Sequence, residues 1–215
     1  STDDMGVLWN IDKETDDIRR FMTGDAICQG TGTIWKKSSF VNIGMWDESL
    51  KLWQDVELHL RALLGGCRYV KRMDLKPDIY LRISDESLSR TGFHSRPKLE
   101  SRIRVFRSVV EKMQEKNIIG KYKIELRILL RDLIASASNS AFFDLTKQVM
   151  QLPVVKQLFS PSEIQVMRRY FFVRKFKIYK IPFLGNKAAS DLSKLETNPP
   201  GTIGKFKYEE ELIAG

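Results

Sequence analysis

Hydrophobic and polar positions follow two different patterns along the chain. Before residue 95, short apolar runs stand between turns. In the run Pro77–Ser84, apolar residues alternate with the residues between them, as in a half-buried strand. We therefore predict short strands at Met5–Asn10, Gly30–Trp35, Arg68–Arg72 and Pro77–Ser84. Two helices are predicted among them. A short one is capped by Ser38 and Ser39 and runs through Ile43, and a longer one covers Leu52–Leu64, where apolar residues recur on a single face. This alternation predicts an α/β layer, or α+β if the layer is partial, in residues 1–95.

From residue 96 onward the apolar positions follow a helical period. A 4-3-4-3 spacing along one seam predicts a first amphipathic helix, with its apolar face formed by Leu99, Ile103, Phe106, Val110 and Met113. Further helices are predicted over Lys121–Ala137 and Ser140–Leu152. Ser160–Glu163 has the pattern of a capping box with proline at the first helical position, so a fourth helix should start there and reach about Arg174. We expect a basic helical region at 96–181 and a loosely ordered tail at 182–215.

Charge divides the chain in the same way. Residues 1–95 carry 13 Lys/Arg and 15 Asp/Glu, whereas residues 96–215 carry 23 and 12, within an overall net charge of +9. The basic part suits anionic lipid surfaces, phosphorylated lipid-linked substrates or nucleic acid. The two cysteines, Cys28 and Cys67, do not form a disulfide framework, and neither a signal peptide nor a membrane-spanning run is evident. We therefore expect a cytoplasmic protein.

Three segments occur in an order that resembles a known family. The first is Gly30–Phe40, a glycine-bearing strand. The second runs over Phe40–Leu50, with the pattern F-x-x-x-G-x-(aromatic)-D-E, and continues into Trp53–Arg61. The third, Tyr80–Ser89, follows Y-x-R-x-x-x-x-S-x-S. Together, over about Met5–Arg90, they resemble the second half of family 2 glycosyltransferases, which implies part of a GT-A fold and an inverting transfer of sugar from a nucleotide-sugar donor to a saccharide or lipid-linked acceptor.

The resemblance assigns the catalytic base to Asp55. The family's acidic pair maps onto Gln54–Asp55, and the second acid removes the proton of the acceptor hydroxyl. Gln54 replaces the first acid, which loses a charge near the acceptor. In the first turn of the predicted helix, the helix dipole favours an ionised carboxylate. The alternative interpretation is that Asp55 only caps the helix.

Other residues in these motifs would border the donor and acceptor pocket. Gly32 and Thr33 would approach the sugar, and Trp53 would stack on the acceptor. Asp47 and Glu48 would shape the pocket floor, although both also suit a turn before the helix. Trp46 has the same two interpretations as Trp53, sugar stacking or packing.

Metal binding is expected mainly outside this chain. The D-x-D motif that holds Mg²⁺ or Mn²⁺ in the family is absent from the sequence, so we expect the donor-binding half to be missing and the fragment alone to be inactive. The family's metal-contacting histidine aligns with Ser84, and His94 is the candidate to replace it from the following loop. His59 lies four residues after Asp55, but no third ligand is evident from the sequence.

The segment 168–180 mixes cations with aromatic residues. One interpretation is a membrane-surface element at the inner face of a membrane, formed by Arg168, Arg169, Phe172, Arg174, Lys175, Phe176 and Lys177. Another is a helix whose aromatic residues pack on the core. Nucleic-acid binding is disfavoured, because no RNP-like or helix-turn-helix signature is present. The full protein is thus expected to act in polysaccharide biosynthesis at the cell envelope, or alternatively to be a non-catalytic basic module that docks on a membrane or a protein partner.

Overall fold

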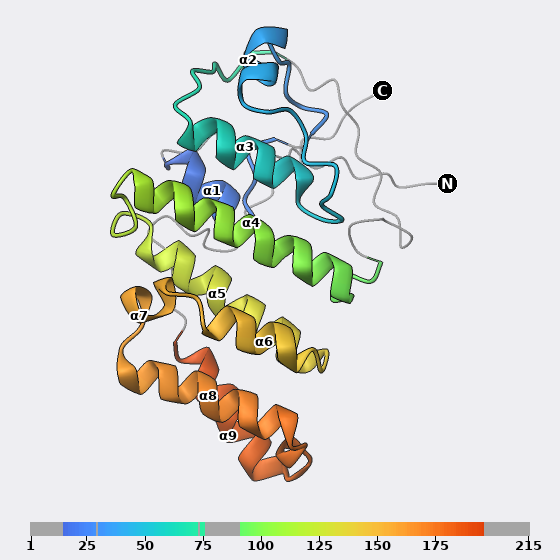
Figure 1. The fold of residues 1–215 in the computed structure, drawn as a ribbon, viewed down its shortest axis with the longest axis vertical. Helices are drawn as coiled ribbons and strands as arrows, with labels where there is room; N and C mark the ends of the chain where they lie inside the picture. The colour runs from blue at the N-terminus through green and yellow to red at the C-terminus, as the bar shows by residue number, and fades with distance from the viewer. Residues whose placement is uncertain (1–14, 29, 73, 76–90, 196–215) are drawn as a thin grey trace.

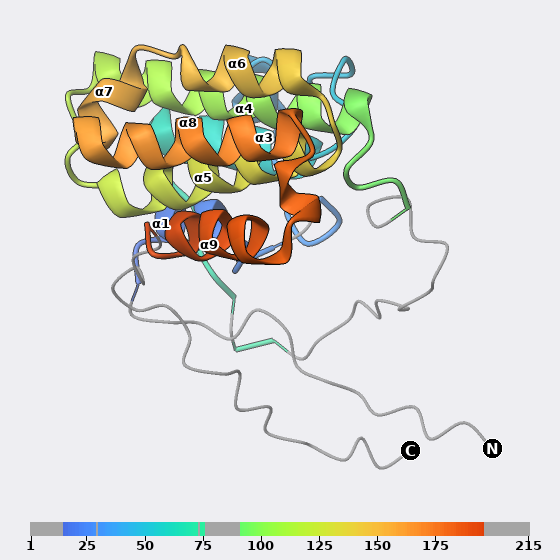
Figure 2. The same ribbon diagram turned by 90° about the horizontal axis from the view of Figure 1, so that it is seen from below.

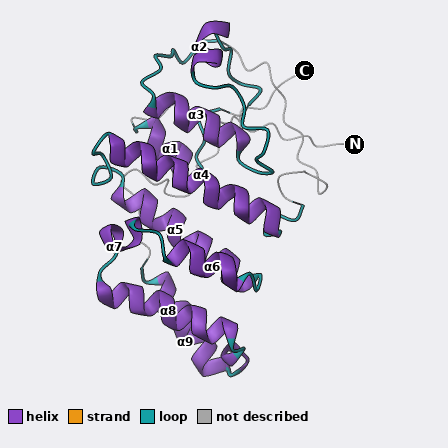
Figure 3. Cartoon of the chain, viewed as in Figure 1, coloured by secondary structure: helices purple, strands orange, loops and turns teal. Residues whose placement is uncertain are grey.

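The computed structural model describes residues 15–28, 30–72, 74–75 and 91–195. These residues form helices connected by turns and loops, and no strand occurs among them (Figure 3). In chain order the helices are α1 (Asp17–Met22), α2 (Lys37–Asn42), α3 (Gln54–Leu64), α4 (Arg96–Glu115), α5 (Lys123–Asn139), α6 (Phe143–Met150), α7 (Val154–Leu158), α8 (Pro161–Lys175), the 3₁₀ helix η1 (Ile178–Lys180) and α9 (Pro182–Ser193).

The helices stack in succession along the long axis of the molecule. Figure 1 shows α2 at one end, followed by α3 with α1, then α4, α5 with α6, and finally α8 with α9 at the other end. A single cluster of buried apolar side chains runs through this stack from Phe21 in α1 to Leu192 in α9 and Leu195 beyond it. Its centre contains fully buried residues of the predicted seams, including Leu99 and Leu126. Burial of these seams against neighbouring helices is what stabilises the individual helices.

The predicted α/β layer is wrong for the described part of the chain. Gly30–Trp35 forms a turn and a loop, and Arg68–Arg72 has no strand partner. Ile34 and Val70 project into solvent, with 100% and 81% of their surface exposed. A strand requires a neighbour to pair its backbone groups, and short apolar runs without one do not form a sheet. The other two predicted strands, Met5–Asn10 and Pro77–Ser84, lie outside the described residues.

The helical predictions from residue 52 onward are largely confirmed. These predicted helices appear as α3, α4, α5, α6 and α8, with ends shifted by a few residues, and the short helix predicted from Ser38 to Ile43 appears as α2. Ser160 and Glu163 form the predicted capping box, in which each side chain accepts a hydrogen bond from the other residue's backbone N–H.

The expectation of a loosely ordered segment beginning at 182 is wrong over Pro182–Ser193, which forms α9. Ala188 and Leu192 of α9 are buried in the core cluster, so tertiary packing overrides a composition that disfavours helix. Residues 196–215 lie outside the described part.

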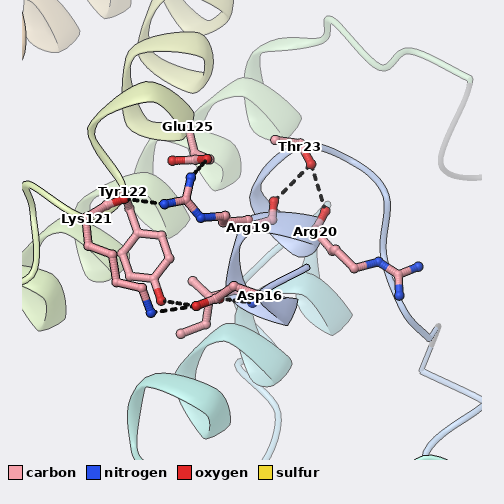
Figure 4. A network of polar contacts seen from close by, with 8 residues as sticks. Asp16, Arg19, Arg20, Thr23, Lys121, Tyr122 and Glu125 are labelled. Carbon is pink, nitrogen blue, oxygen red and sulfur yellow. Dashed lines mark hydrogen bonds and ion pairs between the residues drawn. The ribbon is translucent and has the colours of Figure 1, made fainter. Parts of the chain in front are cut away.

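Polar contacts attach α1 to α5. Figure 4 shows Arg19 reaching Glu125 and the carbonyl of Lys121, while Lys121 and Tyr122 donate to Asp16, the N-cap of α1. Burial alone would raise the pKa of Asp16, but the hydrogen bonds from Lys121 and Tyr122 hold this pKa below its usual value. The network fixes α1 against the start of α5.

Candidate functional site

Asp55 lies in the first turn of α3. Trp53 precedes the helix in the left-handed region, with φ of 66°, and turns the chain into it. The Asp55 carboxylate is half-buried and accepts a hydrogen bond from the N–H of Val56 at 2.9 Å. Gln54 donates to the carbonyl of Leu50 at 2.9 Å, which fixes the entry of the helix. The positive end of the helix dipole favours a carboxylate in this place.

Two of the three motif segments meet beside Asp55. A Cβ placed on Gly30 would lie 3.3 Å from Cη2 of Trp46, which is a tight contact, and 3.8 Å from the Asp55 Cβ, which is ordinary van der Waals contact. The loop that begins at Gly30 and the turn that contains Trp46 therefore converge on the start of α3. The third segment, Tyr80–Ser89, lies outside the described residues.

Arg61 holds the second segment in place. Its guanidinium pairs with Glu57 at 2.8 Å and donates to the carbonyls of Ile43 and Met45. The intervening Gly44 has φ of +91°, a conformation that favours glycine. Because Arg61 belongs to α3, the same helix that carries Asp55 also positions the turn after Met45.

Asp47 and Glu48 occupy that turn. The Asp47 carboxylate accepts hydrogen bonds from the backbone N–H and the hydroxyl of Ser49. The Ser49 hydroxyl is the main cause that holds the pKa of Asp47 below its usual value. Glu48 is exposed. These contacts match the turn-forming interpretation of Asp47.

The aromatic residues near Asp55 have different environments. Trp53 is half-buried, and the Arg102 guanidinium carbon lies 4.9 Å from its ring centroid and 4.7 Å from that of Phe93. Arg102 thus brings the loop of residues 91–95 next to Trp53, with one face of the indole covered. Trp46 is 38% exposed and lies against the Gly30 loop. Trp46 is therefore the more exposed of the two predicted stacking surfaces, although the sequence analysis favours Trp53.

A second group of polar side chains lies beside His59, on the next turn of α3. The Thr33 hydroxyl is 2.9 Å from Nε2 of His59 and 3.1 Å from Sγ of Cys28. The His59 ring stacks on Phe21 at 5.1 Å and on Trp35 at 5.9 Å. No group in the described part lies in hydrogen-bonding geometry with its Nδ1 atom. The backbone of Asp55 nevertheless favours the protonated form of the ring.

The pKa shifts of Cys28 and His59 both favour the neutral forms over a thiolate–imidazolium pair. Burial raises the pKa of Cys28, with Asp55 and Asp17 adding to the rise against the Thr33 hydrogen bond. Burial also lowers the pKa of His59, against the opposing effect of Asp55. Both side chains are therefore neutral near neutral pH, and neither is activated as a nucleophile or a charged acid.

Sequence reasoning did not associate Cys28 with His59. The two residues are 31 positions apart, and Trp35 and Phe21 complete their surroundings from other parts of the chain. No spacing rule links such positions, because the loop geometry alone brings them together.

Metal ligands do not converge here. Among the described residues, no group of three or more His, Cys, Asp or Glu side chains could hold a metal ion. His94 is exposed in the loop before α4 and contacts Phe93 edge-on at 5.1 Å. Of the other predicted pocket residues, Gly32 is exposed, and Thr33 is half-buried and turned toward His59.

A cavity of about 360 Å³ lies at the opposite end of α3. Its lining residues are Thr15, Asp16, Asp17, Ile18, Leu63, Cys67 and Tyr69, none of which was predicted to bind acceptor or donor. Asp17 is already paired with Lys71 and with the Tyr69 hydroxyl. The cavity therefore offers no free acid for the chemistry predicted at Asp55.

No family model, curated protein or solved structure matches this chain. Function must therefore be inferred from the residues around Asp55 and from the sequence motifs that they belong to. In the described ranges, no helix has both the length and the apolar character needed to cross a bilayer.

Proposed function

We propose that this chain is the acceptor-side part of an inverting glycosyltransferase, with Asp55 as the general base. The observation that carries the proposal is the convergence of the Gly30 loop, the Trp46 turn and Asp55 at the start of α3. Sequence motifs placed these segments in one site, and they lie together even though the described fold is helical.

The proposed reaction is a single displacement at the anomeric carbon of a nucleotide sugar. The acceptor hydroxyl oxygen attacks that carbon, its proton passes to the Asp55 carboxylate, and the nucleoside diphosphate leaves with the electrons of the broken bond. Asp55 suits this role because its carboxylate is half-exposed and lies at the positive end of a helix. The loop that begins at Gly30 would be supported by a neutral, packed layer behind the base, formed by Cys28, Thr33 and His59.

Donor binding is proposed to depend on residues outside this chain. The described residues contain no group of three or more His, Cys, Asp or Glu side chains that could hold a metal ion, and no step of the proposed mechanism passes through a metal held by them. The acceptor is proposed to be a saccharide or a lipid-linked saccharide, bound on the Trp46 side of Asp55, and the reaction to occur on the cytoplasmic side of a membrane.

The test is Asp55→Asn in the full-length protein, assayed for sugar transfer with a panel of radiolabelled nucleotide sugars and cell-envelope extracts as acceptor source. Loss of a general base should reduce transfer by about 10²–10⁴-fold. Donor binding, measured by equilibrium dialysis of the labelled nucleotide sugar, should change little.

Glu111→Gln is the matched control, because Glu111 is an exposed carboxylate of α4 remote in sequence from the motifs. It should transfer sugar at the wild-type rate. Retention of near wild-type transfer by folded Asp55→Asn would refute the assignment of the base.

A further inference from the structure

The end of α8, η1 and the start of α9 expose a concentrated set of large apolar side chains. Of the thirteen large hydrophobic residues that are exposed in the described part, six lie within positions 172–184, so this corner differs from scattered surface apolar residues. Their exposed fractions lie between 37% and 73%. We call this set the α8–α9 corner: Phe172, Phe176, Tyr179, Ile181, Phe183 and Leu184. Figure 2 shows these elements meeting at one end of the helical stack.

The corner is held in its conformation by the backbone. Lys177 adopts the left-handed region with φ of 58°, which ends α8 and starts η1. A Cβ on Gly185 would lie 2.7 Å from the Tyr179 carbonyl oxygen, so α9 packs directly on η1. The inward face of α8 is anchored by Met167, Tyr170 and Val173, which are buried. The outward apolar side chains are therefore presented by a packed support.

Aromatic contacts organise the exposed face itself. The Phe172 and Phe176 rings are 4.5 Å apart, one helical turn from each other. The Arg174 guanidinium lies 4.2 Å from the Tyr179 ring centroid, and the Lys175 ammonium 5.5 Å from that of Phe176. Cations thus lie directly beside the apolar surface.

Charge near the corner is predominantly basic, with Glu163 and Asp191 as the flanking acids in the sequence. Residues 164–190 contain seven Lys/Arg and no Asp/Glu. Arg169 forms an ion pair with Asp191 at 3.6 Å, and the Arg174 guanidinium lies over the Tyr179 ring. The other five cations are exposed: Arg168, Lys175, Lys177, Lys180 and Lys187. The sequence analysis placed seven of these residues in the membrane-surface set: Arg168, Arg169, Phe172, Arg174, Lys175, Phe176 and Lys177. To its apolar members the structure adds Tyr179, Ile181, Phe183 and Leu184.

We propose that the α8–α9 corner binds the surface of an anionic phospholipid bilayer. The rings and aliphatic side chains would enter the boundary between headgroups and acyl chains, and the cations would contact lipid phosphates and carboxylates. A second copy of this chain is a poor occupant, since it would bring the same cations face to face. Nucleic acid would pair the cations but leave Ile181 and Leu184 without an apolar partner. The proposal goes beyond the transferase function and does not depend on Asp55.

The test uses the 215-residue chain and sedimentation with phosphatidylcholine vesicles, with and without phosphatidylserine. Binding should require phosphatidylserine and weaken as salt is raised. Lys175→Gln/Lys180→Gln should lower the partition coefficient by at least about tenfold, since each cation near an anionic surface contributes about fivefold. The control Lys147→Gln/Lys156→Gln removes two exposed cations from elsewhere and should bind like wild type, apart from a small effect of net charge.

The apolar contribution is tested by Phe176→Ser/Phe183→Ser, with Val70→Ser/Leu75→Ser as the control that removes exposed apolar side chains from elsewhere. The first pair should lower binding by about tenfold or more and the control should not. All four variants alter exposed side chains, and circular dichroism should show the wild-type helix content. Equal binding to neutral vesicles, absence of binding, or dimerisation through the corner in place of vesicle binding would overturn the proposal. Sedimentation without vesicles, on wild type and the Phe176/Phe183 variant, identifies the last outcome.

Discussion

Glu163 connects the first turn of α8 to α5 through a paired contact with Arg127. The two guanidinium nitrogens of Arg127 lie 2.6 Å and 3.3 Å from the two carboxylate oxygens. Arg127 also donates to the carbonyl of Leu158 and covers the Phe159 ring at 4.4 Å. The Glu163 carboxylate accepts the backbone N–H of Ser160 at 2.8 Å as part of the capping box. These contacts make Glu163 a useful probe of how α8 is attached.

The Arg127 hydrogen bonds, together with the Ser160 hydrogen bonds, lower the pKa of Glu163 from 4.5 to about 2. A difference of that size corresponds to at most ~3.5 kcal/mol of stability. The side chain remains 25% exposed, and solvent screening reduces the contribution to about 1–2 kcal/mol. Because the folded pKa is the lower one, the contribution is fully present above pH ~4.5 and is lost as the pH falls toward ~2.

Glu163→Gln keeps an acceptor for the capping hydrogen bond and removes the charge. Urea unfolding, followed by circular dichroism, should show a loss of about 1–2 kcal/mol at neutral pH. The difference between variant and wild type should shrink steadily below pH ~4.5. Glu111→Gln, on the exposed surface of α4, should show neither effect. A pH-independent loss for Glu163→Gln would refute the charge-based reasoning.

Two further predictions concern the core and the His59 layer. Leu126 is fully buried, so Leu126→Ala should lower the free energy of unfolding by about 2–5 kcal/mol. Leu129 is only partly buried, so Leu129→Ala should lower it by clearly less. Equal losses in urea unfolding would contradict the described packing. Burial lowers the pKa of His59, so its ring-proton NMR signal should titrate with a midpoint below 6.5. The free energy of unfolding should correspondingly fall as the pH drops below ~6.5. A midpoint at or above 6.5 would argue against the Phe21–His59–Trp35 stack.

The helical part of the fold could be predicted because helix signals are local. The capping box at Ser160–Glu163 and the apolar seam of α4 each lie within one contiguous segment, and each helix hydrogen-bonds within itself. The strand predictions at Gly30–Trp35 and Arg68–Arg72 were wrong because a strand exists only where a distant partner pairs with it. No partner is present for either within the described part of the chain.

The candidate site was predictable only in part. Sequence motifs named Asp55 and the glycine-bearing segment before it, and both lie at the start of α3. They did not identify Trp46 as the more exposed aromatic surface, since that depends on Arg102 covering Trp53. Nor did they identify the Cys28–Thr33–His59 layer, whose members approach one another only through the loop.

By itself, then, the sequence determined the approximate position of most helices and where basic charge gathers, and it nominated Asp55 as the candidate base. Tertiary structure alone decided that Pro182–Ser193 is a helix, that Glu163 meets Arg127, and that the apolar residues after Phe172 face solvent beside cations. The physical reason is the range of the interactions involved. Periodicity and capping act over a few residues, whereas burial, pairing and exposure depend on segments that the chain brings together from far apart.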